Sequence, residues 1–370
     1  MMPRRRLAPL LLAASALFAL PAGAETVAIT GGTLAIGDGS PPIARGTVVL
    51  RDGRVVAAGA GIAPPAGARV IDATGQWIAA GIVAGFTDLG IVGVEGVEQT
   101  NDAMAKRSPF SAALDVAPAV DPTSMSIPVN RAGGVTRALV APAASGSIFA
   151  GQGAVIDLGA DMDAVTKPRA FQFVEFGETG AARAGGSRLA TFALFRNALA
   201  QAREFARNPA AFDGNSKESL LTRADAAALV PVLNGQMPLL VHVERASDIL
   251  AVLALRQDYP ALRLVLVGAS EGWRVAQQIA AARVPVIAAA LADLPESFEQ
   301  MAATQSNVGR MARAGVRVAI SSVDASEPHN EARLTQMAGN LVALTRVPGA
   351  TGLDWGAAFA AITSRPAEAV

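Results

Sequence analysis

The sequence predicts an α/β protein built from a small N-terminal β unit and a (β/α)8 TIM-type barrel. Two observations carry this prediction. Residues 25–75 hold short β-branched runs between glycine turns, which is typical of a small antiparallel unit. From residue 76 onward, apolar strands alternate with amphipathic helices, and strands that are apolar on both faces belong to parallel sheets covered by helices. The number of repeats suits the barrel, and a doubly wound open sheet stays as the alternative.

The composition predicts a globular chain without a nucleic acid partner. Of its 370 residues, 51% are hydrophobic and 17% are charged, so a sizeable core can form. The 31 basic and 31 acidic residues balance, so we expect no general attraction to phosphate and no nucleic acid partner. The absence of cysteine excludes disulfides and thiolate chemistry. Two histidines leave any metal site dependent mainly on oxygen ligands.

Residues 1–24 have the pattern of a secretory signal peptide. Three arginines, Arg4 to Arg6, precede an apolar run from Leu7 to Leu20, and the small residues Ala22 to Ala24 form a cleavage site before Glu25. The alternative is a membrane anchor, but the run is shorter than the ~20 residues that span a bilayer. We expect export to the periplasm, with no membrane attachment after cleavage.

Residues 25–75 divide into strands and tight turns. Asp52-Gly53 lies between two apolar runs and predicts a hairpin, because a type I′ turn needs positive φ at both central residues. The predicted strands are Thr26 to Ile29, Thr47 to Leu50, Arg54 to Ala57 and Arg69 to Ile71. Together they indicate a small antiparallel unit.

Residues 76–370 carry the strands and helices of the predicted barrel. The strands are Gly81 to Asp88, Val135 to Val140, Ala154 to Leu158, Pro238 to Val243, Arg263 to Val267, Val284 to Ala288 and Arg317 to Ser321, with one more, indistinct, near Phe171 to Phe176. The clearest helices are Arg188 to Arg207, Ala246 to Arg256, Gly272 to Ala282, Ser297 to Ala314 and Glu331 to Arg346. The long connection from Gly90 to Gly134 follows a strand's carboxyl end, so we expect it to cover the barrel mouth, where active sites are built.

Five segments follow one another in an order that is more specific than any single motif. They are Gly81 to Gly90, Leu239 to Val243 with Ala246 to Ile249, Val265 to Gly268 with Ser270 to Gly272, Ala319 to Asp324, and Ile362 to Glu368. In this order they resemble the amidohydrolase superfamily, in particular its imidazolonepropionase-related branch. The resemblance covers most of the chain that follows the predicted signal peptide.

The resemblance implies a metal-dependent hydrolase of amide, amidine or ester bonds, but with a degenerate set of metal ligands. Such enzymes use a His-x-His pair on strand one, often a carboxylated lysine on strand four, histidines on strands five and six, and an aspartate on strand eight. Here Phe86 and Asp88 stand at the His-x-His positions, and Val267 or Gly268 replaces the sixth-strand histidine. The lysines, which we expect in loops or helix starts, are Lys106, Lys167 and Lys217.

Two residues keep the expected identity at matching positions, namely His242 and Asp324. We therefore expect them to be catalytic, and with Asp88 they could hold one divalent ion, Zn²⁺ or Mn²⁺, at the mouth of the barrel. A site without metal is an alternative. A further alternative is that His242 is a hydrogen-bonded core histidine and that Asp324 caps a loop. We expect His329 at a helix start.

The predicted function is hydrolysis of a C–N bond, in a cyclic amide or another non-peptide small molecule, by an exported amidohydrolase-like protein. The alternative is an inactive barrel that serves as a periplasmic ligand-binding or partner-binding protein. In the family that the chain resembles, the small β unit is half of a composite sandwich completed by strands after the barrel. Because the sequence stops at Val370, we expect a truncated sandwich with open edges that favours pairing with another chain.

Overall fold

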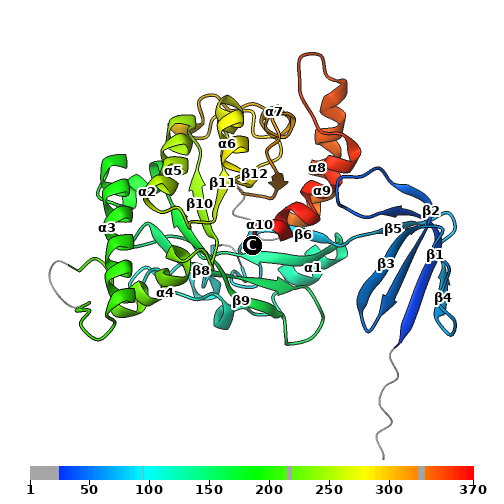
Figure 1. Cartoon of the computed structure of the whole chain (residues 1–370), viewed down its shortest axis with the longest axis horizontal. Helices are drawn as coiled ribbons and strands as arrows, with labels where there is room; N and C mark the ends of the chain where they lie inside the picture. The colour runs from blue at the N-terminus through cyan, green and yellow to red at the C-terminus, as the bar shows by residue number, and fades with distance from the viewer. Residues whose placement is uncertain (1–24, 95, 215–218, 324–329) are drawn as a thin grey trace, which may run out of the picture. The chain divides into compact units, whose positions relative to one another are not determined.

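The computed structural model describes residues 25–94, 96–214, 219–323 and 330–370 (Figure 1). These residues form two compact units, one of residues 25–34 and 43–78 and the other of residues 35–42 and 79–370. The predicted signal peptide lies outside the described residues. Across the described ranges, no helix is long and apolar enough to cross a membrane.

The first unit is a five-stranded sheet. Its strands are β1 (Thr26–Ala35), β2 (Ile43–Arg51), β3 (Arg54–Ala60), β4 (Arg69–Asp72) and β5 (Trp77–Ala79), in the order β3-β2-β1-β4 with β5 also paired to β1. Strands β1, β2 and β3 are antiparallel, and β4 is parallel to β1. The predicted hairpin is confirmed, because Asp52 and Gly53 join β2 to β3 with φ of 51° and 71°.

This sheet supplies one layer of the predicted sandwich. A small apolar cluster forms around Leu34, Val48 and Ile78, all at most 9% exposed. In contrast, Val55 and Val70 are more than half exposed. Both valines lie on strands at the ends of the sheet order, so the described residues leave apolar edge strands uncovered.

The second unit is built on an eight-stranded sheet. Its strands are β6 (Ile82–Thr87), β7 (Val135–Val140), β8 (Phe149–Asp157), β9 (Val165–Glu175), β10 (Leu239–Val243), β11 (Leu264–Gly268), β12 (Val286–Ala288) and β13 (Val318–Ile320). They are hydrogen-bonded in chain order, from β6 to β13. Because the order nowhere reverses, the sheet curls into a nearly closed barrel, and the doubly wound alternative is wrong.

The prediction of eight β/α repeats needs one correction. Strand β8 runs antiparallel to both β7 and β9, whereas the other neighbouring pairs are parallel. The connections on either side of β8, residues 141–148 and 158–164, contain no helix. Parallel neighbours need a crossover of about a dozen residues or more, so connections this short force the antiparallel direction.

A serine side chain joins the first and last strands of the barrel. The backbone N–H of Phe86 on β6 donates to Ser321 Oγ at 2.9 Å, and that hydroxyl lies 3.0 Å from the Phe86 carbonyl oxygen, to which it donates. Nearby, the N–H of Val83 donates to the Ile362 carbonyl at 2.9 Å. Side-chain and loop contacts thus replace a strand ladder at this seam.

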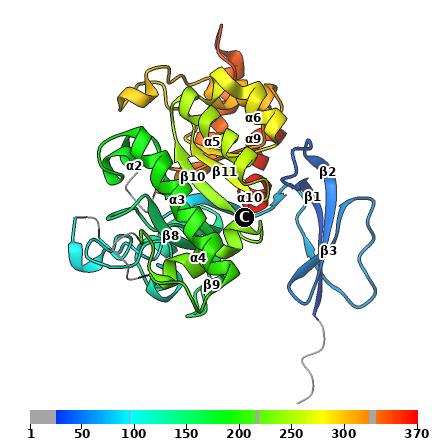
Figure 2. The same ribbon diagram turned by 60° about the vertical axis from the view of Figure 1, so that its left-hand side comes forward.

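Helices surround the barrel (Figures 1 and 2). They are α1 (Ser126–Ala132), α2 (Gly177–Arg183), α3 (Arg188–Arg207), α4 (Arg223–Leu233), α5 (Ala246–Asp258), α6 (Ala276–Ala282), α7 (Asn307–Arg313), α8 (Leu334–Ala343), α9 (Trp355–Ala361) and α10 (Ser364–Ala369). Short 3-10 turns are η1 (Glu98–Thr100), η2 (Ala117–Ala119), η3 (Gly272–Val275), η4 (Phe298–Gln300), η5 (Asn330–Arg333) and η6 (Leu344–Arg346). Phe195 of α3 and Ile249 of α5 belong to the core between the helices and the outer faces of the strands.

The helix predicted at 297–314 is interrupted. It consists of η4 and α7, separated by residues whose backbone groups bond elsewhere. The Ala302 N–H donates to Glu271 Oε1 at 3.0 Å, and its carbonyl accepts from Trp273 Nε1 at 2.8 Å. Since these groups are used in tertiary contacts, the helical ladder cannot run through them.

The barrel interior forms its own apolar cluster, and the two-residue period of the strands decides what faces it. Phe171 and Phe173 of β9 and Leu240 of β10 belong to this inner cluster. The next residues of the same period, Glu175 and His242, lie at the carboxyl ends of these strands. The strand geometry therefore turns two polar side chains toward the barrel mouth.

Candidate active site

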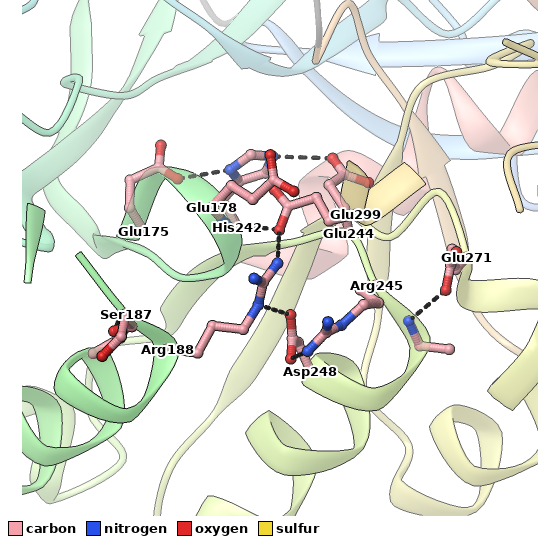
Figure 3. A network of polar contacts seen from close by, with 12 residues as sticks. Glu175, Glu178, Ser187, Arg188, His242, Glu244, Arg245, Asp248, Glu271 and Glu299 are labelled. Atoms are coloured by element: carbon pink, nitrogen blue, oxygen red, sulfur yellow. Dashed lines mark hydrogen bonds and ion pairs between the residues drawn. The ribbon is translucent and has the colours of Figure 1, made fainter. Parts of the chain in front are cut away.

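His242 lies between two carboxylates at the barrel mouth (Figure 3). Its Nδ1 is 2.6 Å from Glu175 Oε2, and its Nε2 is 3.0 Å from Glu244 Oε1. Glu175 and His242 face each other because they are register partners of the parallel β9–β10 pair. The side chains of Glu175, His242 and Glu244 are 13%, 21% and 2% exposed, so water weakens these contacts little.

The two carboxylates decide the charge of the histidine. Burial opposes protonation, but the negative charges and hydrogen bonds of Glu175 and Glu244 raise the pKa of His242 well above 6.5. Burial would raise the pKa of Glu244, yet the His242 contact and the hydrogen bond from the Ser270 N–H at 2.7 Å lower it. The two carboxylates therefore favour the imidazolium over the neutral ring.

Gly268 makes room for this arrangement. It ends β11 with φ of +86°, and a Cβ built on it would lie 2.1 Å from Glu244 Oε1. The resemblance led us to expect a histidine position on this strand. In the structure, a carboxylate that follows the neighbouring strand fills the space beside Gly268 instead.

A cavity of about 170 Å³ opens beside the histidine. Its walls include three acidic residues, Asp88, Glu175 and Glu331. Phe86 and Phe173 supply an apolar part, with ring centroids 4.9 Å apart at an edge-to-face angle of 63°. The cavity therefore offers hydrogen-bonding carboxyl groups beside a hydrophobic wall, which is typical of a small-molecule site.

Glu331 is a deeply buried carboxyl group on this cavity. It is 2% exposed, and burial raises its pKa to about 7. The N–H of Ser322 and the hydroxyl of Ser321, each 3.3 Å from a carboxylate oxygen, oppose the rise, whereas the negative charge of Asp88 adds to it. A carboxyl group that changes charge near neutrality inside a cavity is suited to proton transfer.

A second polar network supports the mouth on the helix side (Figure 3). Arg188 of α3 bonds Asp248 at 2.6 Å through Nε and Glu299 at 2.9 Å through its terminal nitrogen. Glu299 also accepts from the N–H of Glu178 at 2.7 Å, and burial raises its pKa despite these partners. The network ties α2, α3 and α5 to the loop after β12.

The structure brings together part of the predicted site. His242 and Asp88 both lie at the mouth, with Glu175 bonded to the first and lining the same cavity as the second. Asp324 and His329 lie outside the described residues. Ala103, which belongs to the 90–134 connection, also lines the cavity.

Three acidic residues of the site were not predicted from the sequence, and the position of one lysine was predicted wrongly. Glu175 ends the strand that was indistinct in the sequence, and Glu244 lies two residues beyond His242, on the same side by strand period. No sequence pattern around Glu331 indicated a role in the site. Lys167 lies within β9 rather than in a loop, but it is exposed and near the strand's beginning, away from the mouth.

The described residues do not by themselves fit a metal ion. Among them, no group of three or more His, Asp and Glu side chains could hold one. Both ring nitrogens of His242 are engaged by carboxylates, so an ion would have to displace Glu175 or Glu244. The set of Asp88, His242 and Asp324 stays a prediction, because Asp324 is not described.

Comparison with known proteins shows the fold. No protein-family model and no curated protein sequence matches the chain. Among solved structures it is similar to an amidohydrolase from Thermotoga maritima MSB8, with a TM-score of 0.77, 20% identity, and coverage of 92% of this chain and 88% of that one. It is also similar to a molinate hydrolase (TM-score 0.51, 18% identity, 94% and 85% covered) and to a prolidase complexed with N-methylphosphonate-L-proline (0.51, 15%, 93% and 87%). The chain has the fold of these amidohydrolases.

Proposed function

We propose that this protein hydrolyses a C–N bond of a small molecule in the mouth cavity. One observation carries the proposal: Asp88, Glu175 and Glu331 line the same cavity, beside a histidine held in an ion pair. Environments that push the pKa values of neighbouring acids apart create an acid and a base at one pH. The likeness in fold to an amidohydrolase from Thermotoga maritima supports the reaction class.

The cavity supplies the two proton transfers that amide hydrolysis needs. As the water oxygen bonds to the carbonyl carbon, a carboxylate on the wall, Asp88 or Glu175, takes the water's proton. As the C–N bond breaks, Glu331 donates its proton to the leaving nitrogen, which a pKa of about 7 permits near neutral pH. Glu331 then takes up a proton and the base releases one, which restores the site for the next reaction.

His242 acts on this chemistry through Glu175. The 2.6 Å bond fixes the orientation of the Glu175 carboxylate. Glu244, held by Ser270, fixes the other side of the ring. Since the cavity has a volume of only about 170 Å³, the reacting part of the substrate must be small.

A divalent ion and membership of the imidazolonepropionase-related branch stay predictions. A Zn²⁺ or Mn²⁺ ion on Asp88, His242 and Asp324 would supply a polarised water, and no step above depends on it. Elemental analysis of the purified protein and of His242→Ala tests the ion. Export to the periplasm is also proposed, and a mature N-terminus at Glu25 in exported protein would support it.

The test of the function is release of amine from a panel of small linear amides, cyclic amides and ureas. We expect hydrolysis by the wild type, a loss of about 100-fold in kcat for Glu331→Gln, and no change for the exposed Glu204→Gln. Equal turnover by wild type and Glu331→Gln would contradict the role of Glu331.

The second candidate function is a binding protein without turnover. It is favoured by Phe86, an apolar residue at a position where the resemblance implies a metal ligand. Saturable binding of a panel member to the wild type, with no amine released over many hours, would favour this function over hydrolysis.

A further inference from the structure

A groove of about 490 Å³ adjoins the mouth cavity. The two hollows share Ser322 and Val323, which follow the last strand of the barrel. One wall of the groove is a face of η5 and α8, and the facing wall is the segment after β12, which includes Leu291. A molecule seated with one end in the mouth cavity can therefore extend into the groove.

The α8 wall carries hydrogen-bond donors. Arg333, Gln336 and Asn340 are spaced three and four residues apart, which places them on one helix face. Among the described residues, Arg333 has no ion pair within 4.0 Å, although the carboxylate of Glu296 also lines the groove. In the part of the chain that the structure describes, the Arg333 guanidinium therefore lines the groove without an ion pair.

The two hollows differ in charge. Acidic side chains line the mouth cavity, so it repels a carboxylate and favours the nitrogen end of a substrate. The planar fork of Arg333 matches the geometry of a carboxylate and can bond both of its oxygens. Together the hollows would orient a molecule that carries an amide at one end and a carboxylate at the other.

We infer that the groove is a carboxylate subsite, with Arg333 as its anchor and Gln336 and Asn340 as further donors. The inference rests on the proposed function, and it names the substrate class as small amides that bear a free carboxylate. Leu291 and Met337 line the groove as well and provide contact for an apolar body between the two polar ends.

The test compares two probes, N-acetylglycine and N-acetylglycinamide, which differ only in that the carboxylate of the first is an uncharged amide in the second. Titration calorimetry on the full chain measures both affinities. We expect the wild type to bind N-acetylglycine about tenfold more tightly than N-acetylglycinamide, and Arg333→Gln to bind the two alike. Arg333→Lys, which keeps the charge but not the fork, should retain part of the preference.

Arg346→Gln is the matched control, because Arg346 is also exposed, ends η6 beyond the same helix, and does not line the groove. Its preference for N-acetylglycine should equal that of the wild type. The inference is overturned if the wild type shows no preference, if Arg333→Gln keeps it, or if Arg346→Gln loses it as well. A thermal melt of each variant checks that the fold is intact.

Turnover separates this inference from the proposed function. If Arg333 governs binding but the wild type releases no amine from any amide of the panel, the carboxylate subsite is supported and the proposed hydrolysis is contradicted. If the protein hydrolyses both probes with the same kcat/KM, and Arg333→Gln changes neither value, the proposed hydrolysis is supported and the carboxylate subsite is contradicted.

Discussion

Two glutamates at the barrel mouth are equally buried and behave in opposite ways. Glu244 and Glu331 each expose 2% of their surface. Burial raises the pKa of Glu331 to about 7, and the hydrogen bonds from two serines do not outweigh it. Burial acts on Glu244 as well, but the contact with the His242 imidazolium lowers its pKa. Burial alone therefore does not decide the charge of a carboxyl group here.

The difference assigns separate tasks to the two sides of the mouth. On the β10 side, His242 lies between Glu175 and Glu244 and holds both carboxylates in position, and its contact lowers the pKa of Glu244. On the β13 side, no described cation contacts Glu331, so its proton is exchangeable near neutral pH. A site that transfers protons needs both a group that holds its charge and a group that changes it.

Removing the cation should have the largest effect. In His242→Phe, Glu175 and Glu244 lose their partner, and a charge left unpaired in a buried site costs about 3 kcal/mol or more. We expect the free energy of unfolding in urea at pH 7 to fall by that amount. The pKa of Glu244 should then rise, as that of Glu331 does.

A double variant distinguishes lost charge pairing from lost packing. In His242→Phe with Glu244→Gln, the more deeply buried carboxylate is also neutral, so most of the lost stability should return. If the double variant is no more stable than His242→Phe, the loss came from packing, and the comparison of the two glutamates loses its explanation.

The stability effect of Glu331 should depend on pH. Its folded pKa of about 7 lies above the ordinary value of 4.5, so between these pH values the folded state binds the extra proton. Stability therefore falls as pH rises from 4.5 to 7, by on the order of 3 kcal/mol. Glu331→Gln removes this slope, so relative to the wild type it should gain stability at pH 8 but not at pH 4.5.

Urea unfolding of both proteins at several pH values measures this difference. The raised pKa of His242 withdraws its stabilisation as pH rises from about 6.5 through that pKa, and the lowered pKa of Glu244 withdraws its own as pH falls below 4.5. Both proteins share these contributions, so the difference between their curves reports Glu331. Parallel curves for wild type and Glu331→Gln would show that Glu331 titrates normally.

Gly268 tests how closely the β10 side is fitted. Alanine at this position has two costs. Its backbone is strained at a φ of +86°, and its Cβ would clash with Glu244 Oε1 at 2.1 Å. Gly315, with φ of +91° and no atom within 4 Å of its Cβ position, isolates the backbone cost. We expect Gly315→Ala to lose about 1 kcal/mol and Gly268→Ala about 1 kcal/mol more, measured by urea unfolding. Equal losses would mean that Glu244 moves aside freely.

Local and periodic features of the fold were predictable from the sequence. Asp52-Gly53 specifies its hairpin through the backbone conformation that the turn requires, and the apolar strands specify the barrel. The direction of β8 was not predicted, because it follows from two connections that hold no helix, and the bounds of β9 were indistinct.

The candidate site was predictable only where it follows strand order. His242 and Asp88 come at strand ends, so sequence position alone sends them to the mouth. Glu175 was missed along with its indistinct strand. Glu331 lies ten residues beyond Ser321, and only the tertiary fold returns its carboxyl group to that serine. Its raised pKa depends on burial that no local pattern encodes.

Ser321 should give the smallest effect and sharpen the β13 side of the comparison. Its hydroxyl joins the backbone of Phe86 at the barrel seam and also lies 3.3 Å from Glu331 Oε2. Ser321→Ala should lower the free energy of unfolding by about 1 kcal/mol, since it leaves the partly buried Phe86 N–H without this acceptor. It also removes a hydrogen bond that favours the charged form of Glu331, so the fall in stability should extend to a higher pH than in the wild type. A loss of stability without that shift would mean that Ser321 stabilises the barrel seam and does not affect the pKa of Glu331.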